Sequence, residues 1–208
     1  MAVKVVDPRN HECRSVVLAA GPGRRFGRGK LAAELHGEPI LSHVCAAVVD
    51  ALAAGALEQG WVVVAADDRA ARLQAARAGL VPVINPSPEA GISQSVRLGL
   101  ETAEAQVTVE ALLLLLGDQP LVRVETMQRL IQAWRDGAGP VVRPRYGDEP
   151  DTPGHPVLLD RLVWPLCRQA SGDRGLTGIL PQATLIDVAG ANPDIDTPAD
   201  LQLLEDHP

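Results

Sequence analysis

The stretch Ser15-Val-Val-Leu-Ala-Ala20 runs directly into Gly21-Pro-Gly-Arg-Arg-Phe-Gly-Arg-Gly-Lys30. The first part predicts a buried strand, and the second is a glycine-rich loop with four cations in seven residues. Glycines allow the backbone to approach a ligand closely, and their amides can line an anion-binding concavity. The four cations would repel one another without an anion between them, so the loop predicts a polyphosphate ligand.

Two common phosphate-binding motifs do not fit this loop. A P-loop requires glycine where Arg24 stands and a serine or threonine where Leu31 stands. In a dinucleotide fingerprint Phe26 would replace the third glycine, and the acidic residue expected roughly 20 residues later is absent, because the next strand ends at Asp67. A solvated loop without a ligand is the alternative interpretation.

The rest of the chain alternates short apolar runs with helical periodicity. Strands are predicted at 61–66, 80–84, 111–116, 141–145 and 184–188, and helices at 40–54, 69–78, 92–103, 122–134 and 157–169. Strands that are apolar on both faces are typical of a parallel sheet covered by helices. We therefore expect an α/β fold with one domain, a Rossmann-like, doubly wound and mostly parallel sheet flanked by helices. The polar, proline-rich stretch 147–154 predicts a loop over a site.

The charge and composition of the chain argue against several kinds of binding partner. The 208 residues carry 26 acidic and 19 basic side chains, a net charge of −7, and only two of the cations are lysines. This balance argues against nucleic acid and anionic membranes as partners. The cysteines have no metal or disulfide spacing, and the N-terminus has no apolar signal core, so we expect buried thiols and a cytoplasmic protein.

Two aspartates stand where an open α/β sheet binds its ligands. Asp118 follows the most apolar strand, and Asp196 precedes a helix that starts at Pro198. Together with the cationic loop they predict a Mg²⁺ site, because Mg²⁺ prefers carboxylate oxygens and phosphates. Each aspartate alone has a second interpretation: Asp118 as a turn cap before Pro120, and Asp196 as a helix N-cap.

Several motifs in order resemble one family. They are Leu18-Ala-Ala-Gly-x-Gly-x-Arg25-Phe-Gly-x-x-Lys30, Asn85-Pro86, Gly91-Ile-Ser-Gln-Ser95, Gly117-Asp118-Gln-Pro120, Gly154-His155-Pro156, Gly172-Asp-Arg-Gly175 and Asp194-Ile-Asp196-Thr-Pro. The chain resembles the MobA-like NTP transferases, most closely the molybdenum cofactor cytidylyltransferases. The resemblance covers about residues 15–204 and implies the fold of the nucleotide-diphospho-sugar transferases. Ala20 favours the cytidylyltransferase branch, because the guanylyl-transferring relatives usually carry glycine there.

The resemblance also implies roles for individual residues. A single nucleotidyltransferase domain over 1–208 would have a nucleotide-binding half at about 14–120 and an acceptor-binding half at about 121–208. Arg25 and Lys30 would be catalytic, and Asp118 and Asp196 would hold Mg²⁺. Gly154, His155 and Pro156 would face the acceptor, although His155 is equally interpreted as a bond to a loop carbonyl. Residues implied to bind the nucleotide are Leu18, Ala19, Ala20, Gly21, Gly23, Arg25, Lys30, Asn85, Ser93 and Ser95, whereas Asp194 is interpreted as structural.

The activity implied is transfer of CMP, or another nucleoside monophosphate, from a nucleoside triphosphate to molybdopterin with release of pyrophosphate. A phosphate nucleophile is already ionised, so no general base is expected. The product could then pass to a molybdoenzyme or its maturation chaperone. Two alternatives stay open: transfer to a sugar or hydroxy-acid phosphate, and a non-catalytic, pterin-binding maturation factor. A dehydrogenase has no support beyond the glycines.

Overall fold

The molecule is built on one twisted sheet, seen in a computed structural model that describes residues 12–21, 23, 25–27, 29–148, 151–172 and 176–206. Strand order is β5-β4-β1-β6-β8-β7-β9. The bounds are β1 (Glu12–Ala19), β4 (Gly60–Ala65), β5 (Val81–Asn85), β6 (Val109–Leu116), β7 (Val141–Tyr146), β8 (Val157–Asp160) and β9 (Thr184–Val188). All neighbouring pairs are parallel except those that β8 makes with β6 and β7. The predicted doubly wound, mostly parallel sheet is confirmed.

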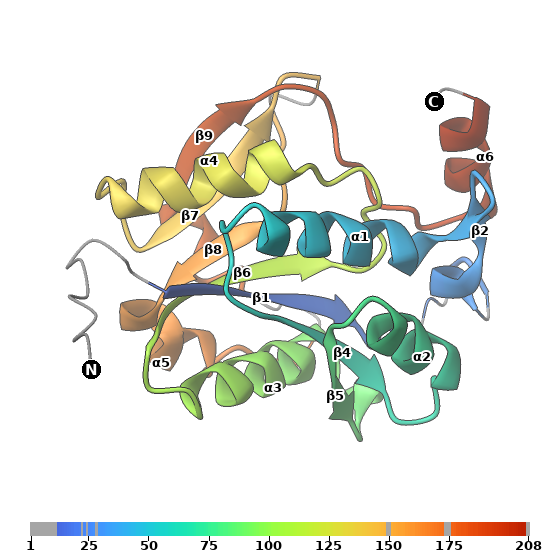
Figure 1. Cartoon of the computed structure of the whole chain (residues 1–208), viewed down its shortest axis with the longest axis horizontal. Coiled ribbons are helices and arrows are strands. Elements are labelled where there is room, and N and C mark those ends of the chain that lie inside the picture. Colours follow the sequence, from blue (N-terminus) through green and yellow to red (C-terminus); the bar gives the residue numbers. More distant parts are fainter. Residues whose placement is uncertain are drawn as a thin grey trace, which may run out of the picture.

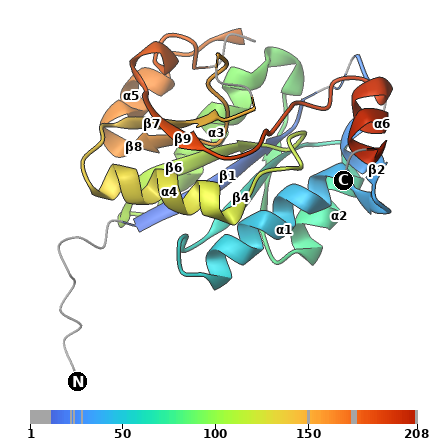
Figure 2. The ribbon, with the colours of Figure 1, turned by 90° about the horizontal axis from the view of Figure 1, so that it is seen from above.

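Helices cover both faces of the sheet, as Figures 1 and 2 show. One face carries α1 (Ile40–Ala53), α2 (Arg69–Arg77) and α4 (Val124–Arg135), and the other carries α3 (Ile92–Glu104) and the short α5 (Trp164–Cys167). A last helix, α6 (Pro198–Asp206), lies beside the small β2 (Glu34–Leu35) at one end of the sheet (Figure 1). No helix in the described part of the chain is both long and apolar enough to cross a membrane.

Alternation along each strand divides the core into two layers. In β1, Val17 and Ala19 face the α1–α4 layer, whereas Val16 and Leu18 face the α3–α5 layer. All four are buried, and so are the three cysteines, as the sequence predicted. Because apolar burial is the main favourable term in folding, this two-sided strand fixes both layers around β1 and β6.

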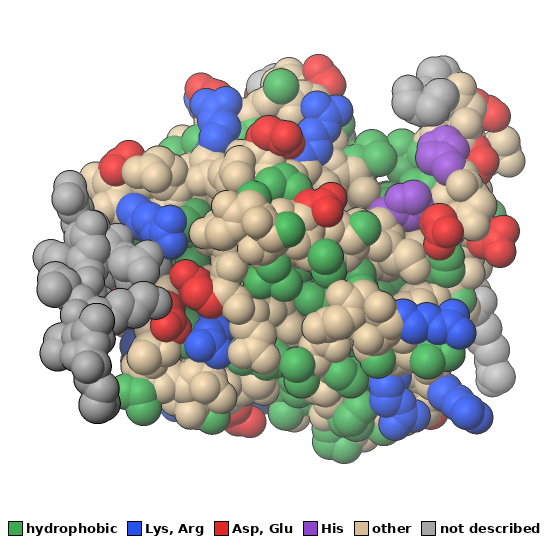
Figure 3. All heavy atoms as spheres, in the orientation of Figure 1, with side chains coloured by type: hydrophobic (Ala, Val, Ile, Leu, Met, Phe, Trp, Pro, Cys, Tyr) green, Lys and Arg blue, Asp and Glu red, His purple; other side chains and the backbone are tan. Residues whose placement is uncertain are grey.

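A smaller third cluster lies away from the sheet. Leu35 and Ile40, at the hairpin of β2 and β3 (Glu38–Pro39), bury against Ile195, and Leu31 and Leu201 pack around them. The hairpin and α6 are also joined at their surface, where acidic and histidine side chains gather (Figure 3). The apolar cluster of Leu35, Ile40 and Ile195 packs the segment that follows the glycine-rich loop against the segment that carries Asp196.

One predicted element is wrong. The stretch 157–169 was expected to form one helix, but it divides into strand β8, a 3-10 turn (Arg161–Val163) and α5. Val157, Leu158 and Leu159 are fully buried because β8 lies between β6 and β7, where both faces of a strand are covered. A short apolar run of this kind looks the same in a buried strand and in a buried helix. The hairpin of β2 and β3 was also missed.

Candidate functional site

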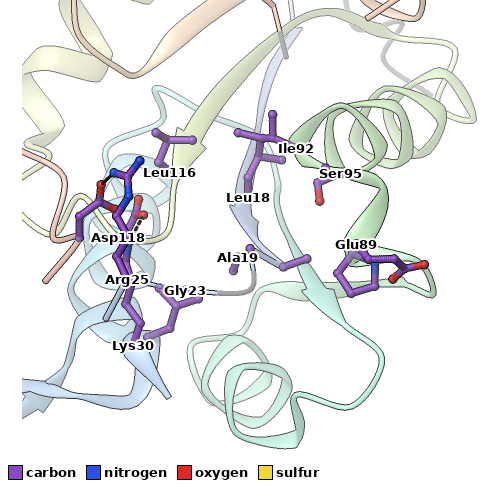
Figure 4. Close-up of a pocket in the computed structure, with 16 residues that line it drawn as sticks. Leu18, Ala19, Gly23, Arg25, Lys30, Glu89, Ile92, Ser95, Leu116 and Asp118 are labelled. Atoms are coloured by element: carbon purple, nitrogen blue, oxygen red, sulfur yellow. Dashed lines mark hydrogen bonds and ion pairs between the residues drawn. The ribbon is translucent and has the colours of Figure 1, made fainter. Parts of the chain in front are cut away.

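A cavity of about 530 Å³ opens at the carboxyl ends of β1 and β6. Figure 4 shows it extending from Lys30 and Asp118 on one side, past Leu18 and Ala19, to Ser95 on α3. Eight of the ten residues predicted to bind the nucleotide line its wall: Leu18, Ala19, Ala20, Gly21, Gly23, Arg25, Lys30 and Ser95. Both predicted metal ligands, Asp118 and Asp196, line it as well. The glycine-rich loop and the two aspartates therefore meet at one cavity.

Lys30 is the centre of an ion-pair cluster in this cavity. Its ammonium nitrogen lies 2.7 Å from Oδ2 of Asp118 and 3.1 Å from Oδ1 of Asp196. The side chain is only 10% exposed. Burial alone would lower the pKa of Lys30, but hydrogen bonds and charge from the two carboxylates outweigh it and raise the pKa. Lys30 is therefore a cation at neutral pH.

Arg25 approaches the same cluster from the solvent side. Its guanidinium donates to Oδ2 of Asp196 at 2.6 Å, and its side chain is 78% exposed. The hydrogen bond from Lys30, followed by the charges of Lys30 and Arg25, holds the pKa of Asp196 below its usual range. Asp196 is therefore ionised and faces two cations, although it belongs to the half of the chain expected to bind the acceptor.

Backbone contacts hold the two aspartates side by side. The amide of Gly117 donates to the carbonyl of Leu18 on β1, and the amide of Ile195 donates to the carbonyl of Asp118. The turn after Asp196 is fixed by Asp200, whose carboxylate accepts from the amides of Asp196 and Thr197. This is a helix cap at the start of α6. It fixes the backbone from which Asp196 reaches the cavity.

The donor set fits a divalent cation that also binds a phosphate ligand. Within the described ranges, no group of three or more His, Cys, Asp or Glu side chains could hold a metal by itself. Mg²⁺ is usually bound by one or two carboxylates together with substrate phosphates and water, which is what Asp118 and Asp196 could offer. Burial, followed by the negative charges of Asp118 and Asp196, raises the pKa of the nearby Asp194, so its ionised form is less favoured than that of an exposed aspartate.

Of the three polar residues predicted to contact the base or ribose, only Ser95 lines the far end of the cavity. Ser95 lines the wall, and its hydroxyl accepts a hydrogen bond from Asn85 at 3.0 Å. Asn85 is fully buried, and its oxygen accepts from the amide of Ser87. Ser93 is fully buried as well, and its hydroxyl has no hydrogen-bond partner among the described atoms. Neither Asn85 nor Ser93 lines the cavity, and Asn85 holds the hydroxyl of Ser95, which does.

The predicted acceptor segment lies outside the wall of this cavity. Gly154 packs against the ring of Tyr146, and the carbonyl of His155 accepts from the Tyr146 hydroxyl at 2.8 Å. Burial, followed by the charge of Arg143, lowers the pKa of His155 to about 4, so the imidazole is neutral at pH 7. The segment before β8 is thus ordered by β7.

A polar bridge missed by the sequence reasoning joins this segment to the cavity. The side-chain amide of Asn192 donates to both the His155 carbonyl and the Gln119 side chain, each at 3.4 Å. Gln119 directly follows Asp118, so its place after the strand was a usable signal, but Asn192 stands in no motif. Other predicted parts, Arg24, Arg28 and residues 173–175, lie outside the described residues.

Comparison with known proteins agrees with this geometry. Residues 15–186 match the family described as MobA-like NTP transferase domain. The chain belongs to this family. The match covers β1 through most of β9, and it therefore includes the glycine-rich loop, Asp118 and the Gly-His-Pro segment, whereas Asp196 follows it.

Several individual proteins are also similar to this NTP transferase domain. The bifunctional protein GlmU of Burkholderia orbicola (strain MC0-3) is 38% identical over 162 residues, which cover 76% of this chain and 31% of the relative. The chain therefore spans less than a third of the length of this curated relative. Among solved structures, Rv0371c from Mycobacterium tuberculosis H37Rv is similar with a TM-score of 0.76 and 26% identity, over 94% of this chain and 98% of that one. Its manganese complex has a TM-score of 0.75 and 25% identity, over 95% and 100%.

Proposed function

We propose that this NTP transferase domain is a Mg²⁺-dependent cytidylyltransferase that transfers CMP from CTP to a phosphate group on molybdopterin. The observation that carries the proposal is the convergence of Lys30, Asp118 and Asp196 beneath a glycine-rich loop in one cavity. Cations beside paired carboxylates serve a reaction in which negative charge must be neutralised and reactants aligned. A protein that only binds and delivers a pterin has no use for this arrangement.

The shape of the cavity supports one orientation of the nucleotide. The triphosphate lies along Ala19, Ala20 and Gly21, with the loop amides and the cations at its charged end. The ribose and base extend toward Ser95, on the opposite side of the cavity in Figure 4. Gly23 supports this loop in a left-handed conformation (φ 54°), which favours glycine.

The reaction is an in-line displacement at the α-phosphorus. An oxygen of the acceptor phosphate forms a bond to the α-phosphorus, the bond from that phosphorus to the bridging oxygen breaks, and the electron pair leaves with pyrophosphate. Lys30 and Arg25 neutralise the charge that accumulates on the leaving group. Mg²⁺ held by Asp118 and Asp196 would supply Lewis-acid stabilisation of the phosphate oxygens. No side chain needs to remove a proton from the nucleophile.

The acceptor approaches from the side of residues 154–156, in the half of the chain from about 121 to 208. Asn192 supports this direction of approach, because its side-chain amide donates both to the His155 carbonyl and to Gln119, the residue next to Asp118. The choice of CTP rests on the resemblance at Ala20, and the need for a divalent metal is supported by the manganese complex of Rv0371c. A second acceptor class, sugar or hydroxy-acid phosphates, fits the same chemistry.

The test is pyrophosphate release from each of the four nucleoside triphosphates with Mg²⁺, with molybdopterin and with sugar phosphates as acceptors. Release with CTP and molybdopterin is expected. Release only with a sugar phosphate would show that the acceptor is a sugar phosphate and not molybdopterin. Tight pterin binding without any pyrophosphate release would refute the proposal that the protein is an enzyme. Lys30→Ala should lower turnover by at least about tenfold, roughly 1.4 kcal/mol of transition-state stabilisation.

A further inference from the structure

The position of Lys30 conflicts with metal binding by its two neighbours, Asp118 and Asp196. One ammonium donates to Oδ2 of Asp118 and to Oδ1 of Asp196 at the same time. These two carboxylates are the proposed ligands of Mg²⁺, and Lys30 is the proposed contact of the triphosphate. In the structure both carboxylates are bound to the one ammonium, and Figure 4 shows Lys30 beside Asp118. A cation of the protein thus stands where a metal cation is needed.

The ammonium and a divalent ion cannot share this place. Mg²⁺ requires oxygens at about 2.0–2.1 Å in near-octahedral geometry, and a neighbouring ammonium would both repel it and occupy the same lone pairs. A metal that arrives alone must therefore push Lys30 away from two charge-assisted hydrogen bonds, which are among the strongest in proteins. The displaced ammonium, 10% exposed in this structure, would then need another anion.

The glycine-rich loop defines where that anion can come from. The stem of Lys30 packs against Gly23, where an added Cβ would lie 3.2 Å from Cβ of Lys30. Lys30 lines the same cavity as Ala19, Ala20 and Gly21, so an ammonium that leaves the carboxylates can turn toward the loop without leaving this cavity. A phosphate bound against that loop lies within its range and replaces the carboxylates as its partner.

We infer that Lys30 makes metal binding conditional on the nucleotide: it occupies the metal position between Asp118 and Asp196 until a triphosphate draws it away. The site then selects a metal together with a triphosphate over either one alone, and Lys30 is the residue that determines this specificity. The inference rests on the proposed function for the identity of the anion. By linkage, the factor by which nucleotide strengthens metal binding equals the factor by which metal strengthens nucleotide binding.

The experiment titrates the full chain with Mn²⁺ and follows free Mn²⁺ by electron paramagnetic resonance, with and without a non-hydrolysable CTP analogue. In the wild type the analogue should raise Mn²⁺ affinity at least about tenfold, or roughly 1.4 kcal/mol. Lys30→Met should bind Mn²⁺ alone at least about tenfold more tightly than the wild type. The analogue should raise the Mn²⁺ affinity of this variant by a smaller factor than in the wild type, because its phosphate oxygens still bind the metal but no ammonium has to be displaced. These readouts do not require turnover.

Two further variants test whether Mn²⁺ affinity depends on a cation that stands between Asp118 and Asp196 or on any positive charge nearby. Lys30→Arg keeps a cation that reaches both carboxylates, so free Mn²⁺ should bind as weakly as in the wild type. Arg25→Met removes an equal charge from the exposed side of Asp196, and it should raise Mn²⁺ affinity by less than about fivefold, the ceiling for an exposed ion pair.

The inference is wrong if Lys30→Met binds Mn²⁺ no more tightly than the wild type, or if the analogue leaves wild-type Mn²⁺ affinity unchanged. Should Lys30→Met fail to fold by circular dichroism, Lys30→Gln, which also lacks the charge, takes its place in the same titration. Failure of the proposed function is distinct: pyrophosphate release would be absent even where the analogue and Mn²⁺ bind cooperatively.

Discussion

Gly154→Ala is the substitution whose effect follows most directly from the structure. A Cβ at Gly154 would lie 2.6 Å from Cε2 and 2.8 Å from Cδ2 of Tyr146. Carbon atoms in contact normally stand about 3.5–4.0 Å apart, so the buried ring must move by about 1 Å. Gly154 does not have a positive φ, and the added methyl group is therefore costly for steric reasons alone.

The expected magnitude combines two contributions. Overpacking a well-filled interior costs about 1–3 kcal/mol. Displacing the ring also weakens the hydrogen bond from the Tyr146 hydroxyl to the His155 carbonyl, worth about 1 kcal/mol. The free energy of unfolding should fall by about 2–4 kcal/mol in total. For a chain of this size that corresponds to a loss of roughly 4–16 °C in Tm.

The assay is urea unfolding of Gly154→Ala in three backgrounds. Tyr146→Phe keeps the ring and removes only the hydroxyl, so the steric cost of the added methyl group remains. Tyr146→Val keeps a strand-favouring side chain but lacks both ring carbons, and there the cost should fall below about 0.5 kcal/mol. An equal cost of Gly154→Ala in all three backgrounds would refute the reasoning, because the destabilisation would then not come from the ring.

Three further expectations concern charge and titration. Asp118→Asn should lower Mg²⁺-dependent turnover by at least about two orders of magnitude while the far-UV circular dichroism spectrum stays unchanged; unaltered turnover would remove this aspartate from the site. Because the pKa of His155 falls from 6.5 to about 4 on folding, the unfolded chain binds a proton between these values that the folded chain does not. Stability should therefore decrease as the pH is lowered through that window, and a His155→Gln variant should show a flatter profile in urea midpoints against pH. Burial raises the pKa of the thiols of Cys13, Cys45 and Cys167, so iodoacetamide at pH 8 should label them only after unfolding. Mass spectrometry measures the labelling, and rapid labelling of the native protein would contradict the burial of these side chains.

Much of the fold was predictable because the parallel strands are buried on both faces. The runs at β1, β4, β5 and β6 are bounded by glycines or polar turns, and the helices between them show clear apolar periodicity. The stretch that begins at Val157 lacked such a signal, since four residues of strand are followed at once by helical turns. Only the pairing of β8 with β6 and β7 distinguishes a strand there, and pairing is a tertiary property.

The site was predictable in its membership and less so in its contacts. Lys30, Asp118 and Asp196 follow strands or precede a helix, so a place at the ligand-binding edge could be inferred for each. Their direct pairing joins residues 88 and 166 positions apart, and local spacing carries no information on it. Asn85 and Ser93 illustrate the converse, because a motif position does not reveal that a side chain is fully buried.

The reversed direction of β8 determines how this chain can diversify. The cavity lies at the carboxyl ends of β1 and β6, so the residues that line it there come after each strand. Because β8 is antiparallel to β6, the end of β8 at this edge of the sheet is its first residue, Val157, which lies opposite Leu114. Residues 154–156 therefore reach that edge from a loop, and β8 leads away from it with its register fixed on both sides. Insertions or deletions in 147–153 would alter the approach to the proposed acceptor side without shifting any strand. The nucleotide side has no such freedom, because its loop is confined between β1 and the cluster of Leu35, Ile40 and Ile195.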